Sequence, residues 1–433
     1  MSREGIEPVE PLAPIAIARP VSAGVPLVAW ITLGVYLLGM AGAWAVFMLV
    51  PGVRVGGNPF SNDRAVFLSL NCGTLTGFPS SVGVSDFNPD SMVGPIASLA
   101  LAVIGVLASM ILGGLAAVRA LRLPYRDVQV IAVAATATVL AALVGAIVLG
   151  IGMAPGSFGV IEAIFQAVCA FGNCGLVMGR FGDLAGWRLH VVLLPLATLG
   201  GMGLPVLMEG YDWALNRRPI SRHSGTTVVA LAAVYLIGMA GLVFFLWPDA
   251  SVHPGRGAMS AAYRGAIGQA SAMSLDARTF GFPQSLDALS RPGQWWLVLL
   301  MAIGAGSAGT AGGLKVTNLI VLGRGFRQSL REAVPGKMFG IACTWLGCYV
   351  LIAVACWILL LQFEPQIPAD RLAFLSVSAV SNVGLATETV SIVGPGLYVL
   401  SVAMLLGRLA PIAMLWWMAR SAGGSEGTEL LAA

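Results

Sequence analysis

The sequence predicts an all-α membrane protein with eight transmembrane helices and four shorter re-entrant helices. Two observations lead to this prediction. Hydrophobic residues make up 57% of the 433 residues and charged residues only 10%, whereas about 25% of a typical soluble domain is charged. Apolar segments long enough to cross a bilayer also alternate with shorter apolar stretches along most of the chain. This composition disfavours a water-soluble enzyme.

Eight segments of about 20 or more mainly apolar residues predict the spanning helices. They cover residues 26–50, 92–118, 128–153, 189–208, 225–247, 295–320, 338–362 and 395–418. The connections after the second, fourth and sixth segments are short and rich in arginine and lysine. Since such loops concentrate on the cytoplasmic side, we expect both termini, residues 1–25 and 419–433, to be cytoplasmic.

The other connections each contain a shorter apolar stretch, at residues 65–75, 161–171, 261–275 and 372–380. These stretches are too short to span a bilayer, which is typical of re-entrant segments. Non-helical backbone at membrane depth is tolerated only inside protein or beside a water-filled cavity. Four such segments in equivalent places therefore predict a central cavity.

Each short stretch ends in a glycine motif. The motifs read TLTGF (74–78), GNCGL (172–176), RTFGF (278–282) and SNVGL (381–385), and their glycines are 98, 106 and 103 residues apart. A phenylalanine lies ten positions before three of the glycines, and Ser271 takes this position in the third motif. A near-constant period indicates duplication. It predicts four repeats, at residues 26–118, 128–208, 225–320 and 338–418. Helix packing or a turn would explain a single glycine of this kind. Four glycines in equivalent places are better explained by a shared function.

Four glycine-containing segments around one axis are suited to binding a dehydrated monovalent cation. Rings of backbone carbonyls replace the water of such an ion, and glycine permits the backbone conformations that this requires. A helix that ends before each glycine directs its negative end at the cavity. The motifs contain almost no acidic residues, so carbonyls rather than carboxylates are the expected ligands. The predicted ion-binding residues are Thr76, Gly77, Asn173, Cys174, Gly175, Thr279, Phe280, Gly281, Asn382, Val383 and Gly384.

The sixth apolar segment is interrupted by five glycines within residues 304–316. Each glycine disfavours a helix by about 1 kcal/mol relative to alanine. The run predicts a flexible loop that obstructs the cavity until it moves. The alternative is a phosphate-binding loop, but no strand precedes it. The residues predicted to form this gate are Gly304, Gly306, Ser307, Gly309, Gly312, Gly313, Lys315 and Arg408.

Lys315 and Arg408 are basic residues within predicted spans, where a charge is costly and indicates function. The alternative for Arg408 is a side chain that extends to the cytoplasmic face. For Lys315 an alternative is equally plausible, in which it starts the helix again after the loop and its side chain reaches the cytoplasmic interface.

The six cysteines are interpreted as small buried hydrophobic residues rather than disulfides or metal ligands. No catalytic set of side chains is evident, so we expect no enzymatic activity. No basic tract suggests nucleic acid as a partner.

These motifs, with RTFGF in the third, resemble the pore loops of the Trk/Ktr/HKT superfamily of potassium transporters. The resemblance covers residues 26–420 and is greatest for the bacterial Ktr- and Trk-type membrane subunits. It implies four M1–P–M2 units around a pseudo-four-fold pore, with filter glycines at Gly77, Gly175, Gly281 and Gly384. Plant relatives with serine at the first position transport Na⁺, so Gly77 implies K⁺. The glycine run at 304–316 is similar to the family's intramembrane loop. LGRLAP (406–411) resembles its last-helix motif, in which the arginine faces the pore.

The resemblance implies uptake of K⁺ across the bacterial plasma membrane through a gated, carbonyl-lined filter, with no chemical step. It also implies a homodimer in the lipid bilayer, bound to a cytoplasmic ring of RCK/KTN-type regulatory subunits. Nucleotide is expected only on that partner, and no cofactor is expected in this chain. The sequence leaves open coupling of K⁺ to Na⁺ or H⁺, as well as Na⁺ permeation. An intramembrane enzyme would need paired acids or a nucleophile with a base, which the spans do not offer.

Overall fold

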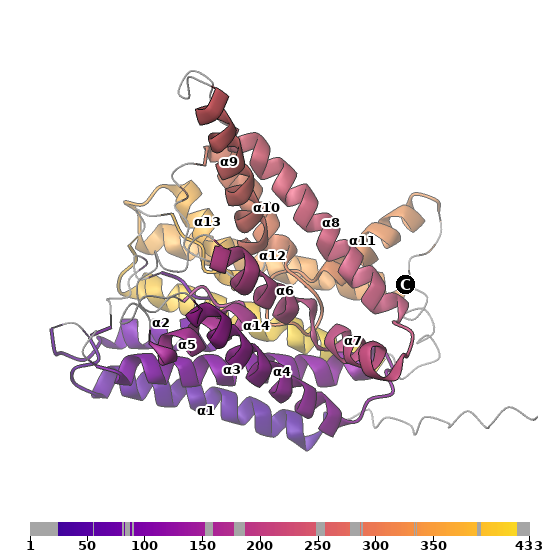
Figure 1. Ribbon diagram of the computed structural model, residues 1–433, viewed down its shortest axis with the longest axis horizontal. Coiled ribbons are helices and arrows are strands. Elements are labelled where there is room, and N and C mark those ends of the chain that lie inside the picture. The colour runs from indigo at the N-terminus through magenta and orange to yellow at the C-terminus, as the bar shows by residue number, and fades with distance from the viewer. Residues whose placement is uncertain are drawn as a thin grey trace, which may run out of the picture.

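In the computed structural model, the secondary-structure elements of the described residues are all helices, joined by turns and loops (Figure 1). The described residues are 25–54, 56–79, 82, 87–88, 91–151, 159–176, 187–247, 256–277, 286, 289–332, 334, 336–387 and 391–421. The predicted terminal segments lie mostly outside them. Side chains are described for these residues except 256–264 and 421.

Among the described residues, six helices are long and apolar enough to cross a membrane. They are α1 (Leu27–Leu49), α3 (Val93–Ala120), α4 (Asp127–Gly150), α8 (Arg222–Phe245), α12 (Lys337–Phe363) and α14 (Pro395–Ser421). The most apolar window of α3 is 83% buried, whereas those of α8 and α12 are 17% and 22% buried. Helix α3 therefore lies in the interior, and the apolar surfaces of α8 and α12 face outward, as lipid-exposed surfaces do. The chain is a multi-pass membrane protein.

Two of the eight predicted spans are broken helices. In the first, a π-helical turn (Leu189–Leu193) leads into α6 (Leu194–Met202), and α7 (Leu204–Asn216) leaves it at an angle of 102°. The prediction of one helix over 189–208 is therefore wrong beyond Met202. The bend lies at Gly203, whose φ of +96° is rare for any residue with a side chain. With this pair counted as one span, the total rises from six to seven.

The second broken span consists of α10 (Arg291–Ile303) and α11 (Val316–Ser329). The non-helical segment between them, residues 304–315, coincides with the predicted glycine-rich interruption. We call this segment the Gly-rich loop.

Four helices occupy the positions of the predicted re-entrant stretches. Helices α2 (Asn62–Gly73), α5 (Val160–Gly172) and α13 (Ala369–Val380) have 12 or 13 residues. Helix α9 (Arg256–Asp276) has 21 residues and is longer than the predicted 261–275. Its Ser271 takes the place of the phenylalanines elsewhere, and its hydroxyl lies 2.8 Å from the hydroxyl of Tyr235 on α8. A polar contact thus replaces apolar packing at this position.

Helix packing follows chain order and closes on itself. Helix α3 contacts α4 and α5, α6 contacts α8 and α9, and α10 contacts α13. Helix α14 then packs against α2 and α3 at the beginning of the chain. In Figure 1, α1, α3 and α4 run side by side along one edge, with α8, α9 and α10 on the opposite side. The short helices α2, α5 and α13 end inside this ring.

Candidate functional site

The ends of α2, α5 and α13 share one backbone conformation. Each helix is followed by a left-handed residue, namely Leu75, Asn173 or Asn382, with φ of +59°, +56° and +49°. In each case this residue donates its amide to the carbonyl three positions earlier, and the next residue donates to the carbonyl five positions earlier, at 2.8–3.1 Å. This is the Schellman motif. Three of the four glycine motifs therefore begin from the same local structure.

The glycines that follow bring the three motifs into contact. Gly77 and Gly384 have φ of +77° and +83°. A Cβ atom at Gly77 would overlap the amide nitrogen of Gly175, and one at Gly384 would overlap the carbonyl oxygen of Thr76. The first motif therefore lies between the second and the fourth. The remaining predicted ion-binding residues, Thr279, Phe280 and Gly281, lie outside the described residues.

Side chains fix the first and fourth motifs to each other. The Asn382 side-chain amide donates to Thr76 Oγ1 at 3.0 Å and to the carbonyl of Met404 at 2.8 Å. Asn71 accepts from the Phe78 amide at 2.8 Å and donates to the Phe78 carbonyl at 3.1 Å. Asn71 was not predicted, and the available signal was an amide side chain within the mainly apolar stretch 65–75. Val383 packs in an apolar cluster, so it presents only backbone to the other motifs.

The Gly-rich loop is entirely buried against α6. The Gly306 amide donates to the Gly201 carbonyl at 2.9 Å, and the Thr310 amide donates to the Gly200 carbonyl at 3.1 Å. A Cβ atom at Gly306 would overlap the Met202 carbonyl. Since these amides already have acceptors on α6, they are not available to a phosphate group, and the phosphate-loop alternative is wrong.

The other predicted loop residues form its ends and its contact with α13. Gly304 and Gly313 have φ of +65° and +69° and lie against each other at the base of the loop. A Cβ atom at Gly312 would overlap the carbonyl of Ser381, at the end of α13. The Ser307 hydroxyl lies 2.7 Å from the Thr317 hydroxyl on α11. The loop therefore lies directly beside the glycine motifs.

Thr310 is the residue through which the loop contacts the second glycine motif. Its hydroxyl donates to the Phe171 carbonyl at 2.9 Å and accepts from the Asn173 side-chain amide at 2.5 Å. Its own carbonyl accepts from Arg408. Sequence reasoning missed Thr310, although it is one of only two hydroxyl residues within the Gly-rich loop.

Arg408 joins the loop to the end of α2. Its side chain is 4% exposed, its Nε donates to the Thr74 carbonyl at 2.8 Å, and further guanidinium nitrogens donate to the carbonyls of Thr74 and Thr310. Thr74 is the C-terminal cap of α2, where a positive charge is favourable. The alternative in which Arg408 extends to the membrane surface is therefore wrong.

Lys315 directly precedes α11 and is 6% exposed. Its ammonium group donates to the carbonyl of Ala311 within the loop. Lys315 therefore restarts the helix, as one of the two interpretations expected, but it does not reach the interface.

Two small cavities lie beside the loop. One of about 20 Å³ is lined by Lys315, Arg408, Ser109, Gly309 and Pro411, among others. The second, of about 60 Å³, has a mainly apolar lining, and its polar lining residues include His223, Thr226, Ser307, Thr317 and Asn318. Neither is larger than a few water molecules, so the loop fills most of the space around it.

The interpretation of all six cysteines as buried is wrong for Cys343, which is exposed on α12, and Cys348 is only partly buried. The other four are buried, and all six are free thiols.

No family model matches the chain. It is 29% identical over 275 residues to Ktr system potassium uptake protein B of Vibrio alginolyticus. This match covers 60% of this chain and 60% of that protein. It is 29% identical over 305 residues to the Bacillus subtilis protein of the same name, with coverage of 64% and 65%. It is 26% identical over 294 residues to potassium/sodium uptake protein NtpJ of Enterococcus hirae, with 62% of each chain covered. Each match thus covers less than two thirds of the relative.

The fold is similar to the crystal structure of the potassium transporter TrkH from Vibrio parahaemolyticus. The TM-score is 0.68 at 15% identity, and the match covers 90% of this chain and 84% of the other. The chain is therefore similar in sequence to Ktr potassium uptake proteins and similar in fold to the potassium transporter TrkH.

Proposed function

We propose that the chain takes up K⁺ through a selectivity filter of backbone carbonyls at the four glycine motifs. The observation that supports this most strongly is the convergence of three identical helix ends, where Gly77, Gly175 and Gly384 bring backbone against backbone. Carbonyls at such a point replace the water of a dehydrated cation, and the ends of α2, α5 and α13 add negative potential. The transported ion is then held without any acidic side chain.

In this proposal the Gly-rich loop and Arg408 form the gate below the filter. The Arg408 charge repels a cation that leaves the filter, and the loop occupies its exit. Opening requires Arg408 and Thr310 to release the contacts that hold the loop. Each hydrogen bond contributes about 1 kcal/mol net, and more when one group is charged. Closure therefore depends on a few kcal/mol, a bias that binding of a regulator can overcome.

The proposed architecture has eight spans, counting both broken helices, four pore helices and two cytoplasmic termini. The four repeats have the boundaries predicted above. We propose a homodimer on a cytoplasmic ring of nucleotide-binding subunits, with no cofactor and no enzymatic activity in this chain. The sequence relatives are named as potassium uptake proteins, and two of them as components of a Ktr system. The gradient of the ion drives its movement.

A second candidate is uptake of Na⁺ together with or in place of K⁺, because one relative is named a potassium/sodium uptake protein. Flux of radioactive rubidium and sodium into liposomes that contain the purified protein tests both candidates. Rubidium uptake that reverses at the K⁺ equilibrium potential supports a K⁺ pathway. Uptake that depends on a Na⁺ or H⁺ gradient supports coupling, and the absence of any cation flux from protein that retains its fold would contradict both.

A further inference from the structure

A groove of about 570 Å³ runs along the outer surface between α4 and the bent pair α6 and α7. Its walls are apolar and include Leu140, Val144, Leu196, Leu199 and Leu207. Leu140, Val144 and Leu199 are 54%, 55% and 43% exposed, so the groove opens onto the surface that faces lipid. Phe171, at the end of α5, closes its inner side.

The bend at Gly203 creates this groove. Because α7 leaves α6 at 102°, it does not continue along α4, and the space beside α4 stays open. Helix α7 buries Leu204 and Met208 and exposes Tyr211 and Trp213, which are 57% and 51% exposed. Tyrosine and tryptophan are enriched at the level of the lipid headgroups, and an amphipathic helix of this kind lies in the interface. The groove therefore ends at headgroup depth.

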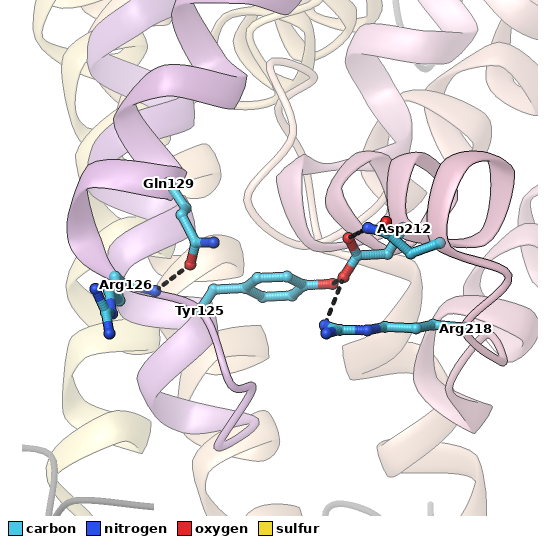
Figure 2. A network of polar contacts seen from close by, with 6 residues as sticks. Tyr125, Arg126, Gln129, Asp212 and Arg218 are labelled. Carbon is cyan, nitrogen blue, oxygen red and sulfur yellow. Dashed lines mark hydrogen bonds and ion pairs between the residues drawn. The ribbon is translucent and has the colours of Figure 1, made fainter.

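Polar side chains close the end of the groove beside α7 (Figure 2). Tyr125, at the start of α4, donates its hydroxyl to Asp212 Oδ2 on α7 at 3.0 Å. Arg218 and Asn216 also donate to the Asp212 carboxylate, at 3.3 Å and 3.0 Å. Partial burial and the bond to Asp212 raise the pKa of Tyr125, so its hydroxyl remains a donor. The Asp212 charge is thus compensated within the protein.

The charge that remains at this end is positive. Arg217 and Arg218 follow α7, and Arg126 precedes α4, all with exposed side chains. Glu209, the other acid of α7, is buried and accepts the Ser221 amide at 2.9 Å. Asp212, which lines this end of the groove, is bonded to Arg218, so the exposed Arg126 and Arg217 leave a net positive charge there.

We propose that the groove binds an anionic phospholipid of the cytoplasmic leaflet. One acyl chain lies along α4, and the phosphate lies beside Arg217 and Arg218. From Gln129 to Val144 the wall is about 22 Å long at 1.5 Å per residue, which matches one leaflet with its headgroup, about half of a 40–45 Å bilayer. Each arginine near the surface favours anionic over neutral lipid.

The bound lipid packs against the two elements that hold the Gly-rich loop. The Phe171 carbonyl accepts from Thr310, and the carbonyls of Gly200 and Gly201 on α6 accept from the loop amides. A filled groove supports these acceptors from behind, whereas an empty one lets them move. The regulatory part of this inference rests on the proposed transport function: flux should be higher in vesicles without anionic lipid.

Lipid binding is measured on the full chain by native mass spectrometry, with phosphatidylglycerol and phosphatidylcholine titrated separately. The test variants are the double substitution Arg217→Gln and Arg218→Gln, and Ala137→Trp, which fills the groove. Arg327→Gln, at an exposed arginine in the last turn of α11, is the control. We expect phosphatidylglycerol to bind about tenfold more weakly to both test variants than to the wild type and the control. Equal binding of phosphatidylglycerol by all four proteins overturns the proposal.

Quenching of tryptophan fluorescence by brominated phosphatidylglycerol gives a second readout that does not require intact complexes in the gas phase. Ala137→Trp adds a fluorophore, so its quenching cannot be compared with that of the wild type. The double variant Arg217→Gln and Arg218→Gln is therefore used for this measurement. Reduced quenching in that double variant supports the site. If Leu140→Cys instead forms a disulfide between two copies and excludes lipid, a second chain covers the groove and the proposal is wrong. These measurements do not depend on ion flux, so failure of transport leaves their outcome unaffected.

Discussion

The glycine motifs and the Gly-rich loop lie side by side but are built in opposite ways. The described motifs repeat one backbone conformation at Leu75, Asn173 and Asn382. The loop occurs once: α3 and α14 are continuous helices, and the fourth predicted span has only the bend at Gly203. Features that the repeats share suit ion selection, which needs equivalent ligands around one axis. A feature present once suits control, because one element that moves is sufficient to open or close a single pathway.

The largest effect is expected where backbone packs on backbone. In Gly77→Ser, the Cβ atom overlaps the Gly175 amide at a backbone φ of +77°, and this conformation alone costs about 1–3 kcal/mol for a residue with a side chain. We expect the preference for rubidium over sodium to fall at least about tenfold, since 1.4 kcal/mol corresponds to a factor of ten. The measurement is competitive flux in liposomes.

Gly57→Ser is the matched control for this substitution. Gly57 has φ of +80°, but no atom lies within 4 Å of an added Cβ. It tests backbone strain without the contact between motifs. If Gly77→Ser folds and keeps the wild-type ion preference, the assignment of the first motif to the filter is wrong.

Arg408→Ala is expected to have the next largest effect, on rate rather than on selectivity. The substitution removes the bonds from the guanidinium to the carbonyls of Thr74 and Thr310. A hydrogen bond to a charged group contributes about 1.5–3 kcal/mol, so basal flux should rise about tenfold or more while ion preference stays unchanged.

Two further variants sharpen this test. Arg408→Lys keeps the charge, but its single nitrogen cannot span both carbonyls, so flux should lie between the wild type and the alanine variant. Arg420→Ala removes an exposed charge from the same helix and should leave flux unchanged. Unchanged flux in folded Arg408→Ala protein would exclude Arg408 from the gate.

Thr310→Val tests the contact between the loop and the second motif. The variant keeps the side-chain shape but loses the hydroxyl that joins the Phe171 carbonyl and the Asn173 amide. Since these groups are buried, we expect a cost of about 1–3 kcal/mol to the closed arrangement and a severalfold rise in flux. Thr198→Val on α6 is the control, because its hydroxyl bonds only within its own helix. Equal flux in both variants contradicts the role of Thr310.

The sequence predicted the features that depend on composition and period. Long apolar segments located the six helices that could span a membrane, and five glycines located the Gly-rich loop. The bend at Gly203 was not predicted because Gly200, Gly201 and Gly203 in an apolar helix also fit close packing between helices. Gly203 breaks its helix because of a tertiary contact: a Cβ atom there would overlap the carbonyl of Ser307.

The site could be predicted only as separate pieces. The glycines and Arg408 stand out locally, one by its period and the other by its charge in an apolar span. Thr310 and Asn71 do not, since a lone polar residue in an apolar stretch most often bonds within its own helix or turn. Their importance depends on partners far away in the chain, such as Phe171 for Thr310, and no local pattern encodes that pairing.

The smallest effect is expected for Ser307→Ala, which separates the loop from α11 without touching the glycine motifs. The Ser307 hydroxyl contacts Thr317 at 2.7 Å, and Thr317 can rotate toward the neighbouring 60 Å³ cavity when this partner is lost. A hydrogen bond that can be replaced in this way contributes about 0.5–1.5 kcal/mol, so flux should rise two- to threefold at most, with ion preference unchanged. Ser329→Ala on α11, whose hydroxyl bonds within its own helix, is the control. A change in ion preference in Ser307→Ala would show that the loop also shapes the filter, and the division between shared and single elements would then no longer hold.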